Sequence, residues 1–295
     1  MALYVQTNTS SINSQRMLAR STRQLDTSYE RLSSGLRINS AKDDAAGLQI
    51  SNRMASQING LTQGNRNAND GISMCQVTEG ALDEVTSMLQ RIRTLAIQSA
   101  NGTNSSAERT AINEEVQQLI KEVRRVGTDT SYGGNLKILG SGVGSTVFQV
   151  GSNAYQTISL TMKSLSKLVT VTASVPIPNS SGTTATIDPN TTLSNMTVTS
   201  ASASQKTIAF MSAIIRQVDS YRAELGAVQN RMESTISNQE NVIENVSDAR
   251  SRIRDVDYAV ETANMTQQSI IQQASTTILT QANQKTQIAM NLLQG

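Results

Sequence analysis

The stretch from Arg31 to Met54 reads RLSSGLRINSAKDDAAGLQISNRM, and it gathers charged and small polar residues between two regions of regular apolar spacing. The consecutive carboxylates Asp43 and Asp44 could bind a metal ion or act as acid and base, but either chemistry needs partner residues. Ser40, three residues before Asp43, also fits a capping box, in which each side chain satisfies a free backbone N–H at a helix start. Both aspartates would complement the positive end of the helix dipole. We therefore interpret the stretch as a structural junction with a helix cap.

The rest of the chain offers few groups for catalysis. Histidine is absent and Cys75 is the only cysteine, which excludes Ser-His-Asp and Cys-His triads, histidine-ligated metals and an internal disulfide. Because Cys75 lies on an apolar stripe without a cationic neighbour, we predict a buried, unreactive thiol. Carboxylate-only catalysis remains formally possible, but no second feature supports it. We expect no enzyme, no catalytic residue, no cofactor and no bound metal.

The composition favours helices that pack on helices. Of the 295 residues 37% are apolar but only 3% are aromatic, and Trp is absent; compact cores and ligand pockets usually rely on large aromatic side chains. The formal charge of +2 gives no strong field toward nucleic acid or an anionic membrane. We expect neither a cleaved secretion signal at the start nor a membrane span, since no apolar run approaches the ~20 residues that a span needs.

Apolar residues recur at intervals of three and four over both ends of the chain, a spacing typical of helices that pack along a seam. A helix from about residue 43 to 100 would be roughly 85 Å long at ~1.5 Å per residue. The polar break NGTNSS (101–106) then predicts an antiparallel return helix. The predicted seam residues of the amino-terminal half are Leu18, Thr22, Leu25, Tyr29, Leu32 and Leu36, then Met54, Ile58, Leu61, Ala68, Ile72, Cys75, Leu82, Leu89 and Ala96, then Ile112, Val116, Leu119, Val123 and Val126.

The carboxy-terminal half has the same spacing from about residue 204 onward, with no proline to interrupt it. Its predicted seam residues are Ile208, Met211, Ile215, Val218, Leu225, Val228, Met232, Ile236, Ile243, Val246 and Ile253, followed by Val256, Val260, Ala263, Ile270, Ala274, Ile278, Ala282, Ala289 and Leu292.

The middle of the chain has a different pattern. Eight of the 17 glycines lie between residues 127 and 182, and all three prolines lie between residues 176 and 189. Short alternating runs around residues 158–162 and 169–175 predict half-buried strands or hairpins, and PIPNSSGTTATIDPN (176–190) predicts an exposed loop. The fold class is thus mainly α: an elongated antiparallel helical bundle or coiled coil built from both chain ends, with a small β-hairpin-rich insert in the middle.

Long collinear segments at both ends closely resemble bacterial flagellin. In the first half these are the stretch 31–54, GLTQGNRNANDGISMCQVTEGALDEV (60–85) and LQRIRTLAIQSANGTNS (89–105). In the second half they are ELGAVQNRMESTISN (224–238), ENVSDARSRIRDVDYAVETANMTQQSIIQQAS (244–275) and the ending NLLQG. The similarity covers roughly residues 1–160 and 205–295, and the middle is shorter than in large flagellins.

The resemblance implies a structural subunit that self-assembles into the helical flagellar filament used for swimming. It implies an inner core from 1–44 plus 255–295, an outer core from 45–165 plus 205–254, and a short variable segment at 166–204. Ser40, Asp43 and Asp44 would lie at the junction between the cores. The residues expected to pack in the filament inner core are Leu18, Leu25, Tyr29, Leu32, Leu36, Val256, Val260, Ile270, Ala274, Ile278 and Leu292.

The resemblance also implies partners. The chain would leave the cell unfolded through the flagellar export apparatus, with an export chaperone on the apolar stripe of residues 256–292, and would meet junction and cap proteins outside the cell. A Toll-like immune receptor would contact the free subunit at Arg91, Leu95 and Glu115. We expect the terminal segments to fold only when neighbouring subunits bury them. A flagellar hook–filament junction protein, which shares such terminal helices, is the alternative interpretation.

Overall fold

The computed structural model describes residues 7–134, 136–140, 142, 144–171, 175–178, 184–187 and 191–294. For residues 171, 175–178, 184–187, 191 and 289–294 it describes the backbone alone. The chain divides into two compact units, one formed by Met1–Ile58 with Val242–Gly295 and the other by Asn59–Asn241.

Five long helices account for most of the described chain, as predicted, and a sixth, short helix lies among the strands. The long helix predicted from residue 43 to 100 and its return helix are both present. The break between them ends in a capping box, since the Ser105 backbone N–H donates to the Glu108 carboxylate and the Glu108 N–H donates to the Ser105 hydroxyl. The helices are α1 Thr9–Ser34, α2 Ala45–Ala100, α3 Ser106–Asp129, α4 Leu165–Leu168, α5 Ala201–Arg254 and α6 Tyr258–Gln294.

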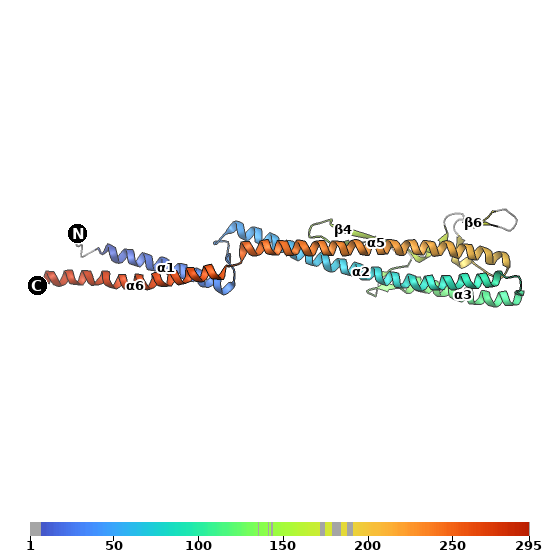
Figure 1. Ribbon diagram of the computed structural model, residues 1–295, viewed down its shortest axis with the longest axis horizontal. Helices are drawn as coiled ribbons and strands as arrows, with labels where there is room; N and C mark the ends of the chain where they lie inside the picture. The colour runs from blue at the N-terminus through green and yellow to red at the C-terminus, as the bar shows by residue number, and fades with distance from the viewer. Residues whose placement is uncertain are drawn as a thin grey trace. The chain divides into compact units, whose positions relative to one another are not determined.

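In the first unit α1 and α6 lie side by side along their lengths (Figure 1). They are antiparallel, because Ser11 near the start of α1 bonds Asn283 near the end of α6, while Ser28 bonds Glu261. Gly35 ends α1 in the left-handed conformation, with φ of 72°, and donates its N–H to the Arg31 carbonyl. A glycine directly after the last helical turn commonly ends a helix in this way.

In the second unit, a continuous apolar core is formed by parts of α2, α3 and α5 with the residues between α3 and α5. The predicted stripe of α2 is confirmed in large part: Cys75, Leu82, Leu89 and Ala96 belong to this core. Leu61 and Ala68 are also buried, and Met54, Ile58 and Ile72 are half-buried. From α5, Phe210 and Tyr221 are fully buried, and Arg222 reaches across to the α2 carboxylates Glu79 and Asp83 at 3.9 and 3.1 Å. Apart from these aromatic residues, aliphatic side chains fill most of this core, as the low aromatic content of the sequence indicated.

The described strands form four two-stranded antiparallel sheets. The largest pairs β3 (Ser145–Gln149) with β4 (Thr157–Thr161), and the predicted inward residues Ile158 and Leu160 are buried. The others pair β1 (Ser131–Tyr132) with β2 (Leu136–Lys137), β5 (Thr170–Val171) with β8 (Thr191–Thr192), and β6 (Val175–Pro178) with β7 (Thr184–Ile187). A short 3₁₀ helix, η1 (Leu193–Asn195), follows β8.

The prediction of a loop over 176–190 is wrong where β6 and β7 pair. Pro176 lies opposite Thr186 and Pro178 lies opposite Thr184. A proline can occupy a strand with a free edge, where its missing N–H is not needed by a neighbour, and the run TATI (184–187) is rich in β-formers. Residues 179–183 and 188–190 of that prediction lie outside the described residues.

Two glycines of α2 let the β3–β4 hairpin approach the helix backbone. A Cβ at Gly64 would lie 1.9 Å from the carbonyl oxygen of Val150, and one at Gly60 would lie 2.8 Å from Cβ of Ser152. Both distances are shorter than real contacts, so the hairpin packs against helix backbone.

We predict that Gly64→Ala destabilises the second unit by about 1–3 kcal/mol, because the new methyl group must displace the Val150 carbonyl. Gly80→Ala is the matched control: nothing lies within 4 Å of its Cβ, so helix propensity should raise stability by about 0.5–1 kcal/mol. Chemical denaturation followed by circular dichroism compares the two variants. Equal stability of both would contradict the close approach.

Candidate assembly surfaces

The segments between helices in the first unit are bound to each other. Leu36 and Asp255 form an antiparallel bridge, and the Arg37 backbone N–H donates to the Arg254 carbonyl at 2.7 Å. The Arg37 guanidinium donates to the Ile253 carbonyl through Nε and Nη2, at 3.2 and 2.5 Å. Arg37 therefore satisfies carbonyls that the end of α5 leaves free.

Next to these contacts, the predicted junction does cap a helix, but the capping residue is different. The Ser40 N–H and hydroxyl both donate to Asp43 Oδ2, at 2.9 and 3.0 Å, and the Asp43 N–H donates to the Ser40 carbonyl. These contacts close a turn before the helix. Asp44 caps α2, since its Oδ1 accepts the Gly47 N–H at 2.8 Å. Ser40 as the N-cap is wrong, because α2 begins only at Ala45.

The same turn carries a pH dependence. Hydrogen bonds from the backbone and hydroxyl of Ser40 hold the pKa of the Asp43 carboxyl below its ordinary value. A lowered folded-state pKa means that the turn is favoured above the ordinary value and loses this contribution as the pH falls through the folded value. Asp43 is fully exposed to solvent, so the effect is local.

The seam between α1 and α6 consists mostly of small and polar side chains. Seven-residue spacings place Ser14, Ser21 and Ser28 on one helix opposite Ser275, Gln268 and Glu261, in that order, on the other. The inward residues, buried or half-buried, are Ser11, Ser14, Leu18, Ser21, Leu25, Ser28 and Leu32 of α1 and Glu261, Met265, Gln268, Gln272, Ser275, Leu279 and Ala282 of α6. We name this set the polar seam.

Hydrogen bonds cross the polar seam along its length. The Ser21 hydroxyl donates to the Gln268 carbonyl oxygen at 2.7 Å, and the Ser11 hydroxyl donates to the Asn283 side chain at 3.0 Å. The Asn8 amide donates to the Ala282 carbonyl at 2.8 Å. Such bonds fix the helices in one register while contributing only about 0.5–1.5 kcal/mol each.

One carboxylate is buried in the polar seam. Glu261 is 6% exposed; its Oε1 accepts the Ser28 hydroxyl at 2.5 Å, and its Oε2 lies 3.5 Å from Nη1 of Arg31. A buried charge needs such partners, because its desolvation is costly without them.

The apolar residues predicted to form the seam of α6 lie on its other side. Val260, Ile270 and Ile278 are 58%, 60% and 54% exposed; Ala274 is also exposed and Val256 is half-buried. As a surface for α1 this predicted stripe is wrong, because the α6 residues of the polar seam occupy that side. The Leu292 side chain lies outside the described part. Whether other copies cover the stripe stays a prediction.

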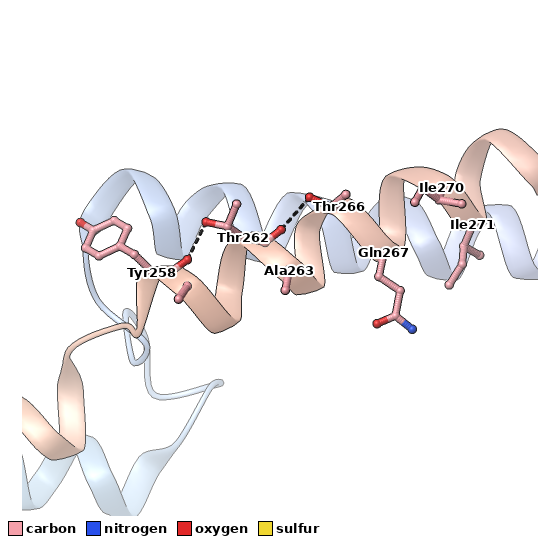
Figure 2. Close-up of a pocket in the computed structure, with 8 residues that line it drawn as sticks. Tyr258, Thr262, Ala263, Thr266, Gln267, Ile270 and Ile271 are labelled. Atoms are coloured by element: carbon pink, nitrogen blue, oxygen red, sulfur yellow. Dashed lines mark hydrogen bonds between the residues drawn. The ribbon is translucent and has the colours of Figure 1, made fainter.

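Figure 2 shows this outer side of α6, where a shallow groove of about 880 Å³ follows the helix surface. Two hydroxyls beside the groove are used within the helix: Thr262 donates to the Tyr258 carbonyl at 2.5 Å and Thr266 to the Thr262 carbonyl at 2.8 Å. The groove therefore offers mainly apolar contact. Its lining residues are Tyr258, Ala259, Thr262, Ala263, Thr266, Gln267, Ile270 and Ile271.

On α1 the predicted seam is correct in part. Leu25 is buried, and Leu18, Leu32 and Leu36 are half-buried. Tyr29 is 58% exposed because Ser28 takes the inward position. The serine and glutamate positions were missed because only apolar residues were matched to the heptad; the serines at seven-residue intervals were the available signal.

The three residues predicted to contact an immune receptor do not share one surface. Arg91 and Glu115 form an exposed ion pair between α2 and α3, with Nη2 and Oε1 2.7 Å apart. Leu95 is 2% exposed and belongs to the core of the second unit. The expectation that Leu95 is presented on this surface is wrong, because its position on α2 faces inward.

Cys75 is buried, as predicted, with no exposed surface. Burial raises the pKa of its thiol to about 11, and the Glu79 carboxylate adds to the shift. The thiolate that would react is therefore scarce at neutral pH.

The described residues contain no group of three or more His, Cys, Asp or Glu side chains placed to hold a metal ion. None of the described helices is long and apolar enough to cross a membrane.

Both helical ends of the chain match models of one protein family. Residues 5–140 match the family model "Bacterial flagellin N-terminal helical region", and residues 208–293 match "Bacterial flagellin C-terminal helical region". The chain is 38% identical to Flagellin B of Vibrio cholerae, over 99% of this chain and all of that protein. It is 39% identical to Flagellin A of Vibrio anguillarum, over the whole of both.

The chain therefore belongs to the bacterial flagellin family, and it is a structural subunit of the extracellular flagellar filament. The alignment with the Vibrio cholerae protein spans 376 positions against 295 residues here, so that relative carries segments that this chain lacks. A solved structure of a putative flagellar hook-associated protein from Vibrio parahaemolyticus is also similar, with a TM-score of 0.57. It covers 72% of this chain and all of that chain at 12% identity, which shows a shared fold alone.

We predict that Ser28→Ala weakens the polar seam, because the buried Glu261 carboxylate loses its closest donor. Loss of a hydrogen bond to a charged group costs about 1.5–3 kcal/mol. The filament of this variant should dissociate at a lower temperature than the wild-type filament, as followed by light scattering. Ser33→Ala, at an exposed position of the same helix, should dissociate like the wild type. If filaments of the two alanine variants dissociate at the same temperature, the Ser28 hydroxyl does not stabilise the buried Glu261 carboxylate.

Proposed function

We propose that the chain polymerises by burying the outer side of α6 against other copies of itself. The observation that carries the proposal is the row of exposed isoleucines and valine on that side. Isolated apolar side chains are ordinary on a protein surface, but a contiguous apolar face is typical of an interaction site. On α1, Ile12, Met17 and Tyr29 are also about half exposed, which supports burial of this helix as well.

In this assembly the inner core consists of residues 1–44 and 255–295, the outer core of 45–165 and 205–254, and 166–204 is the variable segment. Head-to-tail contacts that do not close generate an open helical polymer, so each subunit needs two different complementary patches. The outer side of α6 would supply part of one patch. The chain would have a structural role and no catalytic one, which its membership of a structural family supports.

The terminal segments would be weakly ordered in the free subunit. The polar seam supports this, because serine and glutamine side chains bury little apolar area and each hydrogen bond adds little net stability. Neighbouring copies would then supply the missing apolar contacts, and ordering would accompany binding.

Such terminal segments would also suit export. An unfolded chain without disulfides can pass through a narrow flagellar export apparatus, and an export chaperone would cover the stripe of residues 256–292 until then. The exposed isoleucines support this footprint, since the same apolar side is free in the subunit. Outside the cell, junction and cap proteins would hold the growing end. A junction protein remains the alternative, but 38% identity to a flagellin over nearly the whole chain favours a filament subunit.

We predict that Ile270→Asp abolishes elongation, because burial would desolvate a carboxylate without a partner. Ile270→Leu preserves apolar volume and should elongate normally. Purified subunit is added to fragments of wild-type filament, and polymer mass is measured by sedimentation. Circular dichroism of the free subunit checks that both variants keep the second unit folded. Normal elongation of Ile270→Asp would refute burial of this face.

Recognition by a Toll-like receptor would use the exposed surface around Arg91 and Glu115 of the free subunit. We predict that the exchange Arg91→Glu with Glu115→Arg lowers receptor signalling at least about tenfold, because both charges on the surface are reversed. The intramolecular ion pair can re-form in the exchanged protein, so its melting temperature should stay close to wild type. Cellular reporter signalling and thermal melting are compared on the same preparations. Unchanged signalling would exclude these two residues as receptor contacts.

A further inference from the structure

The β3–β4 hairpin carries no charge in a chain where about one residue in six is charged. From residue 138 to 162 there is no Lys, Arg, Asp or Glu, whereas the whole chain has 25 Lys+Arg and 23 Asp+Glu in 295 residues. Within the described residues, no third strand pairs with either edge of the hairpin. Soluble proteins usually protect such edges with charges, proline or a covering element, because bare edges invite pairing with another chain.

One face of the hairpin is exposed and uncharged. Its cross-strand pairs are Ser145 with Thr161 and Val147 with Ser159, and Val147 is 58% exposed. The opposite face packs inward through Ile158 and Leu160. We name the hairpin outer face as Ser145, Val147, Thr157, Ser159 and Thr161 with Tyr155 at the tip; every one of these six is exposed.

Tyr155 is the most exposed large hydrophobic side chain of the described residues, at 95%. It is also the one non-glycine residue among them with a positive φ, at 66°. A bulky residue rarely adopts this conformation, and such strain persists where the surroundings impose it and a function uses it. Neither the fold nor a packing contact accounts for a tyrosine at this position.

Hydrogen bonds within the turn fix the backbone on both sides of Tyr155. The Val150 and Gly151 N–H groups both donate to the Gln156 carbonyl, at 3.0 and 3.1 Å, and the Asn153 N–H donates to Gln156 Oε1 at 3.1 Å. A backbone held in this way loses little entropy on binding, which favours an anchor residue at this position.

The base of the turn is fixed to both long helices of the second unit. The Asn67 amide of α2 donates to the Gln149 carbonyl, and the Gln239 amide of α5 donates to the Val150 carbonyl, each at 2.8 Å. Together with the close approach at Gly64, these bonds join the hairpin rigidly to the helices.

We infer that the hairpin outer face is a contact between subunits, with Tyr155 as its anchor and a second copy of this chain as its occupant. The inference rests on assembly into a filament and adds a second patch, separate from the outer side of α6. A copy of the same chain fits best, because an open homopolymer requires a further patch on each subunit. An uncharged face rich in hydroxyls also avoids burying unpaired charges in that contact.

Elongation of wild-type filament fragments by variant subunits tests the inference. Tyr155→Asn removes the ring and tolerates a positive φ; we expect the critical concentration for elongation to rise at least about tenfold, as for loss of a hot-spot residue. Val147→Lys should have a similar effect. The matched controls Tyr155→Phe and Val147→Thr keep the ring and the uncharged surface, and should stay within about threefold of wild type.

The melting temperature of the free subunit separates binding from folding. Both test variants should melt at or above the wild-type temperature, because Val147 is mostly exposed and Asn relieves the strain at position 155. Elongation of both test variants at the wild-type critical concentration would overturn the inference. That result would not contradict the proposed polymerisation, because the wild type elongates in the same assay and Ile270→Asp tests the patch on α6 separately.

Thiol labelling gives an independent measurement. Because Cys75 is buried with a raised pKa, Tyr155→Cys supplies a single accessible thiol. Mixed at a low fraction into wild-type subunits, this variant should react rapidly when free and at least about tenfold more slowly in the filament. A thiol that reacts equally in both states would also overturn the inference.

Discussion

The pairing of α1 with α6 depends on side chains that are too small and too polar to cover an apolar helix. The Ser21 and Ser28 hydroxyls donate across to α6, whereas the buried Ser14 donates its hydroxyl to the Ser10 carbonyl of its own helix. The larger apolar residues of α6 are thereby left on its other side, where Ile270 is 60% exposed. Each such residue has on the order of 1 kcal/mol or more to gain from full burial. The internal pairing of the first unit thus determines which face is left for other copies.

The second unit is held together mainly by apolar packing, in contrast to the polar seam of the first unit. Its core is continuous and apolar, and its largest side chains, Phe210 and Tyr221, have no exposed surface. The Tyr221 hydroxyl has a hydrogen-bond partner, because it accepts the Lys163 backbone N–H at 3.1 Å. A unit with such a core can be stable without a partner, whereas the first unit relies on weaker polar contacts. This difference matches the proposed assembly, in which the terminal helices gain their apolar contacts from neighbouring subunits.

Periodicity predicted the helices well, because long amphipathic helices repeat a single spacing many times. It predicted the buried side of α2 and α5, where apolar residues face a large core, but not that of α6. Helix α6 has one polar stripe and one apolar stripe, and the prediction that the apolar stripe faces α1 is wrong. The polar stripe faces α1 instead, since Ser275 is buried and Ile278 is exposed. The cap is at Asp44 and not at Ser40, because Ser40 and Asp43 close a turn before the helix begins. No spacing rule specifies the geometry of that turn. Tyr155 could not be found at all, since strain and exposure are properties of the folded chain.

A seam of repeated serines raises the question of how the register of α1 and α6 is fixed. Serines spaced by seven residues would still meet small residues of α6 after a slip of one heptad. The Glu261 carboxylate would not find its partners: a slip in one direction places Ser21 opposite it but replaces Arg31 with Gln24. A slip in the other direction places Gly35 there, which has no hydroxyl. Either slip buries a carboxylate with incomplete compensation, and the cost of that burial exceeds what a single neutral hydrogen bond returns. One charged residue in a polar seam is therefore sufficient to select the register, as a single polar residue does in coiled coils.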